Sequence, residues 1–220
     1  MSCTIDSSLA VADIASLVLK RGCTVLPTQQ HYTGILLLEA AVHRAECDPA
    51  LREEARALLL PFARGERDFG SNFPNYQCGG NAAARALAAG WLDEARDAVT
   101  HYADAYLNDF PRDDEGLMMM PRHDRPKIWI DAAWAVAPFA CFAGVALERP
   151  ELIDDAVHQI MRMMEIFDDP SCDLIHQSRG FVGPNELSSD HWSRGNGWAA
   201  RRNRSVRRRD RCRSPGSSRA

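Results

Sequence analysis

Residues 130–167, IDAAWAVAPFACFAGVALERPELIDDAVHQIMRMMEIF, decide the fold of this chain. The first part of the stretch, Ile130 to Leu147, is apolar almost throughout. The second part, Glu151 to Phe167, returns apolar side chains at helical spacing. A short turn joins the two parts. The stretch therefore predicts two helices that form a helical hairpin.

The same helical periodicity recurs along most of the chain. Asp48 followed by Pro49 predicts an N-cap and a first helical turn, and Gly90 predicts a break between two helices. Gly116–Arg122 could be extended and Arg179–Ser189 is interpreted as a loop. Paired helices predict an all-α fold, either a solenoid or a closed α/α toroid. The further helices are expected at Leu9–Val18, Tyr32–Ala45, Leu51–Phe62, Asn81–Ala89 and Trp91–Asn108.

The net charge of −4 is distributed very unevenly over the 220 residues. Residues 201–220 hold nine arginines and one aspartate, a balance of +8, which leaves −12 for residues 1–200. Because residues 1–200 carry this negative charge, nucleic acid is not expected as a partner. The start of the chain lacks the basic and apolar regions of a secretory signal. Residues Ala132–Leu147 contain Pro138 and fall short of the ~20 residues that span a membrane, so no membrane partner is expected.

The seven cysteines are odd in number and form no Cys-x-x-Cys pair. We interpret them as reduced thiols of a cytoplasmic protein. Histidines and cysteines do not cluster in the sequence at the spacing of metal ligands, so no metal site is predicted and no cofactor is expected.

The segment His191–Trp198, HWSRGNGW, is not explained by helix packing alone. Glycines at this spacing let the backbone take positive φ and approach a ligand closely. Arg194 offers a planar fork that matches a carboxylate, and the tryptophans offer faces that stack on sugar rings. An Asn-Gly turn leading into a helix is the alternative. The combination of Trp, Arg and Trp favours a binding loop.

Asp131 is a carboxyl among apolar neighbours, Trp129, Ile130 and Trp134 among them. Such a setting tends to raise the pKa of a carboxyl group, as a general acid at neutral pH requires. Alternatively, Asp131 is the N-cap of the helix that follows, where the helix dipole would lower its pKa. The residues alone leave both interpretations open.

Several motifs together resemble a known enzyme family. Trp129, Asp131 and Pro138-Phe139 are followed some sixty residues later by Arg194–Trp198, RGNGW. In this order and spacing they resemble the unsaturated rhamnogalacturonyl hydrolases of glycoside hydrolase family 105, which are related to the unsaturated glucuronyl hydrolases of family 88. The resemblance covers about residues 28 to 200. It also includes Tyr32-Thr33-Gly34, Gly79–Ala82 and the step Pro111-Arg112-x-x-Glu115-Gly116.

The resemblance implies an (α/α)6 barrel of twelve helices in two rings, with the site in its mouth. It implies that Asp131 is the general acid/base, which protonates C4 of a Δ4,5-unsaturated uronic acid while water adds at C5. The resulting hemiketal collapses and releases the sugar. The family positions also imply that Arg194 lies near the substrate carboxylate and that Trp192, Trp198 and His176 line the site. The expected partner is a small oligosaccharide that carries the unsaturated uronic acid.

The chain departs from the family in two places. Many members have an aspartate just before the middle Gly-rich helix start, where this chain has Phe73–Cys78, so Asn75 is the expected substrate-binding replacement. After Ala200 the family continues with further helices, whereas this chain becomes arginine-rich. We expect residues 1–200 to form a partial barrel domain of about seven of the twelve helices. Residues 201–220 are expected to form a basic, disordered tail that arises from truncation or a shifted reading frame; the alternative is a basic arm for nucleic acid or another anionic partner.

Two other classes of function remain open. A sugar 2-epimerase-like isomerase shares the toroid architecture, although the RGNGW element disfavours it. A non-catalytic helical fragment is favoured if Asp131 is exposed and distant from Arg194. The expected function is glycoside hydrolysis of rhamnogalacturonan-derived disaccharides by hydration of the C4=C5 bond, impaired by the incomplete barrel.

Overall fold

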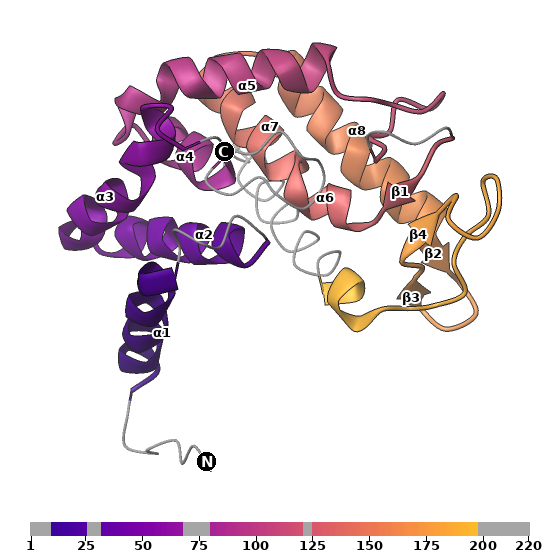
Figure 1. Ribbon diagram of the computed structural model, residues 1–220, viewed down its shortest axis with the longest axis horizontal. Helices are drawn as coiled ribbons and strands as arrows, with labels where there is room; N and C mark the ends of the chain where they lie inside the picture. The colour runs from indigo at the N-terminus through magenta and orange to yellow at the C-terminus, as the bar shows by residue number, and fades with distance from the viewer. Residues whose placement is uncertain (1–9, 26–31, 68–79, 121–124, 198–220) are drawn as a thin grey trace, which may run out of the picture.

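The computed structural model describes residues 10–25, 32–67, 80–120 and 125–197. Within them the chain is a succession of helices, as predicted (Figure 1). From α2 to α8 they follow one another around an arc, with short strands near the end of α8 (Figure 1). The predictions for Asn75, Trp198 and the tail 201–220 lie outside the described residues. The helices are α1 Val11–Val25, α2 Tyr32–Cys47, α3 Arg52–Ala63, α4 Gly80–Ala88, α5 Arg96–Asn108, α6 Asp131–Ala135, α7 Ala137–Ala146 and α8 Pro150–Phe167.

Two helix starts differ from the prediction. The Asp48 side chain accepts a hydrogen bond from Ala50 N at 3.0 Å, so the predicted cap is confirmed, but it caps a 3₁₀ turn, η2 (Pro49–Leu51), that precedes α3. Gly90 ends α4 with a φ of 75°, a conformation that glycine adopts without strain. A second 3₁₀ turn, η3 (Asp93–Ala95), then precedes α5, so the helix expected from Trp91 begins later.

The predicted single helix over residues 130–147 is wrong, because the chain forms two helices there. The interruption is at Val136, whose φ is −115°, and Pro138 lies in the first turn of α7. Proline has no N–H to donate and disfavours helical backbone in the residue before it, so a continuous helix cannot pass through Pro138 unchanged. Counting α6 and α7 as halves of one interrupted helix, the described residues before 193 contain the seven expected helices.

The core forms where α7 packs between α4 and α8. Small residues of α4, such as Ala83 and Ala86, let the apolar α7 approach closely, and both are fully buried. The Phe139 ring of α7 meets Tyr102 of α5 edge to face, with ring centroids 4.7 Å apart. The short α6 is joined to α2 through the buried pair Trp134 and Ile35. Asp131 is therefore the first residue of a helix whose apolar side packs against α2.

A polar knot connects α5, the segment after it and α8. Asp155 accepts hydrogen bonds from both guanidinium nitrogens of Arg112, at 2.6 and 3.1 Å, and from the Tyr106 hydroxyl at 2.5 Å. Arg112 also donates to the carbonyl oxygen of Gly116 at 3.0 Å. Burial raises the pKa of Tyr106, and the nearby Asp155 carboxylate raises it further. This knot holds the family-like step from Pro111 to Gly116.

The described residues contain two antiparallel pairs of two-residue strands, of which β1 precedes α6 and the other three strands follow α8. β1 (Ile128–Trp129) pairs with β4 (Ser178–Arg179), and β2 (Asp168–Asp169) pairs with β3 (Leu174–Ile175). Alternation over two residues cannot be recognised in a sequence, which is why none of the four was predicted. The β1–β4 pair brings the residues before Asp131 against the segment that follows His176.

The N-terminal helix α1 is only partly covered. It projects from the arc (Figure 1), and it buries Leu19 against Ala41 and Ala45 of α2 and Ala55 of α3. Val11, Leu17 and Val18 of the same helix are each more than half exposed. Within the described part of the chain, no helix combines the length and the apolar character that crossing a membrane would require.

Candidate functional site

The site predicted around Asp131 is built where β1 runs into α6. Ile130 N donates to the carbonyl oxygen of Gln177 at 3.1 Å, which extends the β1–β4 pairing up to the residue before Asp131. Asp131 is the first residue of α6, and Ile130 occupies the cap position without a side-chain hydrogen bond. The interpretation of Asp131 as the N-cap is therefore wrong by one residue. Its carboxyl oxygen Oδ2 is buried from solvent.

The segment expected to be a binding loop is a helical turn instead. Residues 193–197 are helical, and Asn196 N donates to the carbonyl oxygen of Trp192 at 3.1 Å. Neither Gly195 nor Gly197 is among the glycines with positive φ, so the prediction of positive φ is wrong. At Gly195 the lack of a side chain lets the turn pack closely against Ile130. A Cβ atom placed there would meet Ile130 Cγ2 at 2.9 Å, closer than real side chains pack.

The asparagine of the same turn connects it to β3. The Asn196 side chain accepts from Ile175 N at 2.9 Å and donates to the Ile175 carbonyl oxygen at 3.0 Å. It also donates to the carbonyl oxygen of Trp192 at 3.2 Å. Asn196 therefore binds the backbone of this chain and joins the turn that contains Arg194 to the residue before His176.

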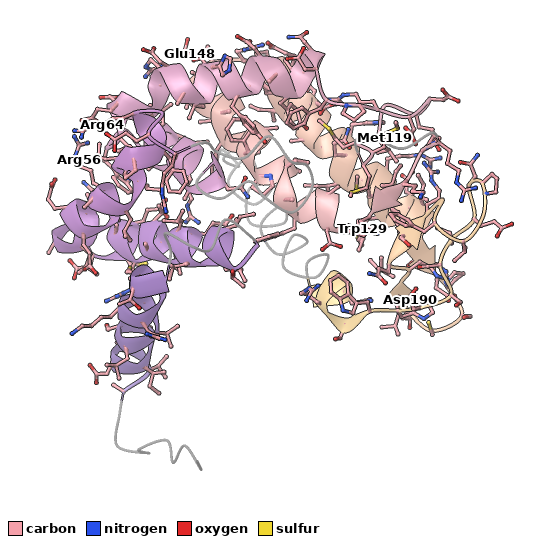
Figure 2. All side chains as sticks on the ribbon, viewed as in Figure 1. Arg56, Arg64, Met119, Trp129, Glu148 and Asp190 are labelled. Carbon is pink, nitrogen blue, oxygen red and sulfur yellow. The ribbon has the colours of Figure 1, made fainter. Side chains whose placement is uncertain are left out.

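Three of the predicted site residues are next in sequence to these contacts. Asp131 follows Ile130, His176 lies between Ile175 and Gln177, and Arg194 precedes Gly195. Because Ile130 contacts both Gln177 and Gly195, and Asn196 binds Ile175, the backbones at these positions meet at one junction. Figure 2 labels Trp129 and Asp190, which precede α6 and the 193–197 turn on the two sides of this junction. The junction brings the backbone next to Asp131, His176 and Arg194 together, while the roles of the three side chains stay predictions.

Two predicted residues of the turn lie together at its surface. The Arg194 guanidinium carbon lies 3.6 Å from the ring centroid of Trp192, a cation–π contact. Arg194 is exposed, so its charged group is accessible from solvent. Trp129, in contrast, stacks on Phe181 with centroids 5.4 Å apart and planes within 11°. One face of the Trp129 ring is therefore covered by Phe181.

His176 is tied to the protein through both ring nitrogens. Its Nδ1 donates to the carbonyl oxygen of Ser188 at 2.6 Å, and its Nε2 lies 3.6 Å from Asp169 Oδ2. His191 lies on the other side of that carboxylate, with Nε2 2.8 Å from Asp169 Oδ2. The hydrogen bonds from Ser171 are the main cause that lowers the pKa of Asp169, and His191 adds to them. The sequence alone did not indicate this cluster, because its residues come from separate loops.

A charged wall borders the junction on the side of β4. Arg179 donates to Asp113 Oδ2 at 2.5 Å and to Glu115 Oε1 at 3.0 Å, while Arg162 of α8 donates to Glu115 Oε2 at 2.6 Å. Hydrogen bonds from the two arginines lower the pKa of Glu115. Asp113, Glu115 and Arg179 line a small cleft beside β4, together with Arg125 and others. Arg179 was missed in the sequence because its segment was interpreted as an ordinary loop.

Another cleft, larger than the one beside β4, lies elsewhere among the described residues. It lies between α3 and α5 and is lined by Phe62, Arg67, His101 and Tyr102 with their neighbours. None of the predicted site residues lines it, and its walls carry no arrangement of the kind seen at the Asp131 junction. The junction is therefore the better candidate for a functional site.

The chain is similar to known proteins in sequence and in fold. The family model described as Glycosyl Hydrolase Family 88 matches residues 36–202. Unsaturated rhamnogalacturonyl hydrolase YesR of Bacillus subtilis (strain 168) is 26% identical over 109 residues, which are 47% of this chain and 32% of YesR. The chain thus spans about a third of the length of this curated relative.

Two crystal structures share the fold. A possible member of the GH105 family from Klebsiella pneumoniae matches with a TM-score of 0.66 at 14% identity, over 89% of this chain and 58% of that one. A family 105 glycoside hydrolase from C. acetobutylicum matches with a TM-score of 0.69 at 16% identity, over 88% and 57%. The helical arc is therefore an incomplete six-hairpin toroid.

Proposed function

The chain belongs to glycosyl hydrolase family 88. We propose that the junction around Asp131 contains the catalytic residue of a hydrolase for Δ4,5-unsaturated uronyl disaccharides derived from rhamnogalacturonan. The observation that carries the proposal is the meeting of the backbones next to Asp131, His176 and Arg194, which lie far apart in the sequence. The name of YesR supports the choice of substrate class.

The proposed reaction adds water across the C4=C5 double bond. The Asp131 carboxyl group gives its proton to C4, and positive charge develops at C5. Water then adds at C5, and the carboxylate takes the proton that this water loses. The hemiketal that results opens and releases the neighbouring sugar. One carboxyl group serves both proton transfers, so the spacing rule for two carboxylates does not apply.

The position of Asp131 suits this role in two respects. The Oδ2 oxygen is buried from solvent, and the residue begins a helix whose next residues, Ala132 to Ala135, are all buried. A carboxyl group on such a rigid element keeps its direction when substrate binds. Burial away from water is also the environment that a general acid needs.

The other residues are proposed to bind the substrate. Arg194 would hold the uronate through its planar guanidinium, already oriented by the Trp192 ring. Trp192 and Trp198 would contact sugar faces, and Asn75 would contact hydroxyl groups. His176, whose ring nitrogens face Ser188 and Asp169, would line the site with its ring. The charged wall of Asp113, Glu115 and Arg179 fixes β4, and thereby the backbone that flanks His176.

The test is an assay for loss of the ultraviolet absorbance of an unsaturated rhamnogalacturonyl disaccharide. Because the chain covers 58% of a structural relative, the assay uses both the chain itself and a chimera completed with the C-terminal helices of a relative. We expect turnover in the chimera near neutral pH. A folded chimera that leaves the double bond intact would contradict the proposal, and conversion of a free saturated sugar instead would favour the epimerase class.

Two substitutions separate catalysis from binding in the active form. Asp131→Asn is nearly isosteric but cannot deliver a proton, so kcat should fall by at least about 10³-fold while KM changes little. Arg194→Lys removes the bidentate grip on the uronate and should mainly raise KM. Arg96→Lys, an exposed arginine of α5, is the matched control. If Asp131→Asn keeps near-normal kcat, the acid lies elsewhere.

A further inference from the structure

A second cluster of reactive side chains lies behind the Arg194 turn. One ligand atom each from Asp169, Cys172 and His191 lies within 4.8 Å of the other two, the one such group found among the described residues. His191 Nε2 is 3.7 Å from Cys172 Sγ and 2.8 Å from Asp169 Oδ2. The three residues come from the β2–β3 turn and from the segment that leads into the 193–197 helix.

The arrangement differs from a catalytic relay. In a nucleophile–histidine–carboxylate triad, the nucleophile and the carboxylate face opposite nitrogens of the imidazole. Here the thiol and the carboxylate both face the same nitrogen, Nε2 of His191. The Asp169 carboxylate also accepts a hydrogen bond from the Cys172 thiol, so each of the three groups faces the other two. A cation placed between the three groups would be coordinated by all of them.

His176 approaches the same carboxylate from the other side. Ser188 contributes a carbonyl oxygen, which can only accept, so the Nδ1 atom of His176 carries a proton. In the neutral ring this leaves a lone pair on Nε2, which lies 3.6 Å from Asp169 Oδ2. Metal-bound histidines are commonly oriented in this way, by donating the other ring N–H to a backbone carbonyl. The two imidazole rings lie 4.8 Å apart between centroids.

The turn that carries the other two groups is preorganised. Asp169 Oδ1 accepts from Ser171 N at 2.9 Å and from Ser171 Oγ at 2.7 Å, which leaves Oδ2 to face the histidines. Cys172 N donates to the Asp169 carbonyl oxygen at 3.2 Å. Two residues separate Asp169 from Cys172 and three separate Cys172 from His176, so one short segment carries three of the four groups.

We propose that Asp169, Cys172, His191 and His176 form a binding site for a divalent cation of the zinc type, one that links the β2–β3 turn to the Arg194 segment. Thiolate, imidazole and carboxylate together suit Zn²⁺ better than Ca²⁺ or Mg²⁺, which prefer oxygen ligands. Zinc bonds of about 2.0–2.3 Å place neighbouring ligand atoms roughly 3.3–3.8 Å apart. The thiol–imidazole distance of 3.7 Å and the His176–Asp169 distance of 3.6 Å already fit. The His191–Asp169 pair must open by about 0.5 Å.

The test uses the whole chain without a polyhistidine tag, stripped of metal with a chelator and titrated with Zn²⁺ or Co²⁺. We expect one equivalent of either ion to bind, and bound Co²⁺ to show a thiolate charge-transfer band in the near ultraviolet. Cys172→Ser should remove that band and weaken Zn²⁺ binding by about 100-fold, and His191→Ala should weaken it comparably. Cys172 is exposed, so its replacement by serine leaves the core intact.

Matched controls come from residues outside the cluster. Cys47→Ser changes another exposed thiol and His101→Ala another exposed histidine, and both should leave metal binding unchanged. No bound equivalent, or a Co²⁺ band that survives in Cys172→Ser, would overturn the site. If His191→Ala fails to fold, Asp169→Asn takes its place, with the same loss of Zn²⁺ affinity expected. These readouts do not involve turnover, so the hydrolase proposal can fail without affecting them.

Discussion

Asn196 holds Ile175 as a neighbouring strand would, with its side-chain amide on both backbone groups of that residue. The amide oxygen accepts the N–H of Ile175, and the amide nitrogen donates to its carbonyl oxygen. A side chain that replaces a strand in this way satisfies two backbone groups at the end of a two-residue pairing, β2 with β3, that cannot hold them by itself. The contact joins the residue before His176 to the helical turn that contains Arg194.

We therefore expect Asn196→Ala to destabilise this end of the molecule. Two partly buried backbone groups lose their partner, which should lower the free energy of unfolding by about 1–3 kcal/mol. Denaturant unfolding followed by circular dichroism measures the change. Asn108→Ala is the control, because Asn108 is exposed at the end of α5 and donates to Asp104 O within its own helix. Equal losses in the two variants would show that the Ile175 contact contributes little.

Gly195 and Gly197 should respond to alanine in opposite directions. A Cβ atom at Gly195 would meet Ile130 Cγ2 at 2.9 Å, so Gly195→Ala should cost about 1–3 kcal/mol as Ile130 is displaced. At Gly197 nothing lies within 4 Å and the backbone is helical, so alanine should be neutral or stabilise by up to about 1 kcal/mol. Thermal unfolding of the two variants makes the comparison. A stabilised Gly195→Ala variant would refute the packing of the turn against Ile130.

The polar knot around Asp155 should make an unusually large contribution to stability for an ion pair. Asp155→Ala leaves the Arg112 guanidinium and the Tyr106 hydroxyl without their shared acceptor, in a setting where the two charged side chains are about one-fifth exposed. We expect a loss of about 2–4 kcal/mol in unfolding free energy. Asp154→Ala, the exposed neighbour on α8, should change stability by less than about 0.5 kcal/mol. Similar losses at both positions would contradict the role of the knot.

The ion pair between α3 and η3 predicts a specific loss of stability in acid. Arg56 hydrogen-bonds Glu94 and lowers its pKa from 4.5 to about 2. Because the folded state holds this proton less tightly than the unfolded state, the contribution is complete above pH 4.5 and disappears as the pH falls towards 2. The melting temperature of Glu94→Gln should therefore be lower than that of the parent at pH 7 and equal to it at pH 2.

The control for this pH dependence is Glu53→Gln, an exposed glutamate of α3. Its melting temperature should follow that of the parent at every pH. A gap between the parent and Glu94→Gln that keeps its size down to pH 2 would mean that the stabilisation does not come from the ionised carboxylate.

The helices could be predicted because each carries its own periodic pattern, and Asp48 and Gly90 acted locally as the sequence indicated. The interruption at Val136 was missed because residues 130–147 are apolar on every side, which hides a change of helix axis. The β1–β4 pair was missed for another reason. Its strands are two residues long and are defined by partners far along the chain.

The candidate site was predictable only as a set of residues. That Asp131, His176 and Arg194 belong together followed from the family resemblance, and the backbone junction agrees with it. Their chemical roles, and those of Trp192, Trp198 and Asn75, stay predictions. The Asp169–Cys172–His191 cluster could not be found in advance, since its histidine and its turn come from segments that meet only after folding.

The long separation of β1 from β4 also determines when the junction can exist during synthesis. A ribosome makes Asp131 and its helix well before Arg179, the pairing partner of Ile128, has left the exit tunnel. Helices α2 to α7 can already form in that interval, before the strand β4 that pairs with β1 is available. Until residue 179 has been made, the backbone groups of β1 therefore lack the strand that pairs with them in the folded protein.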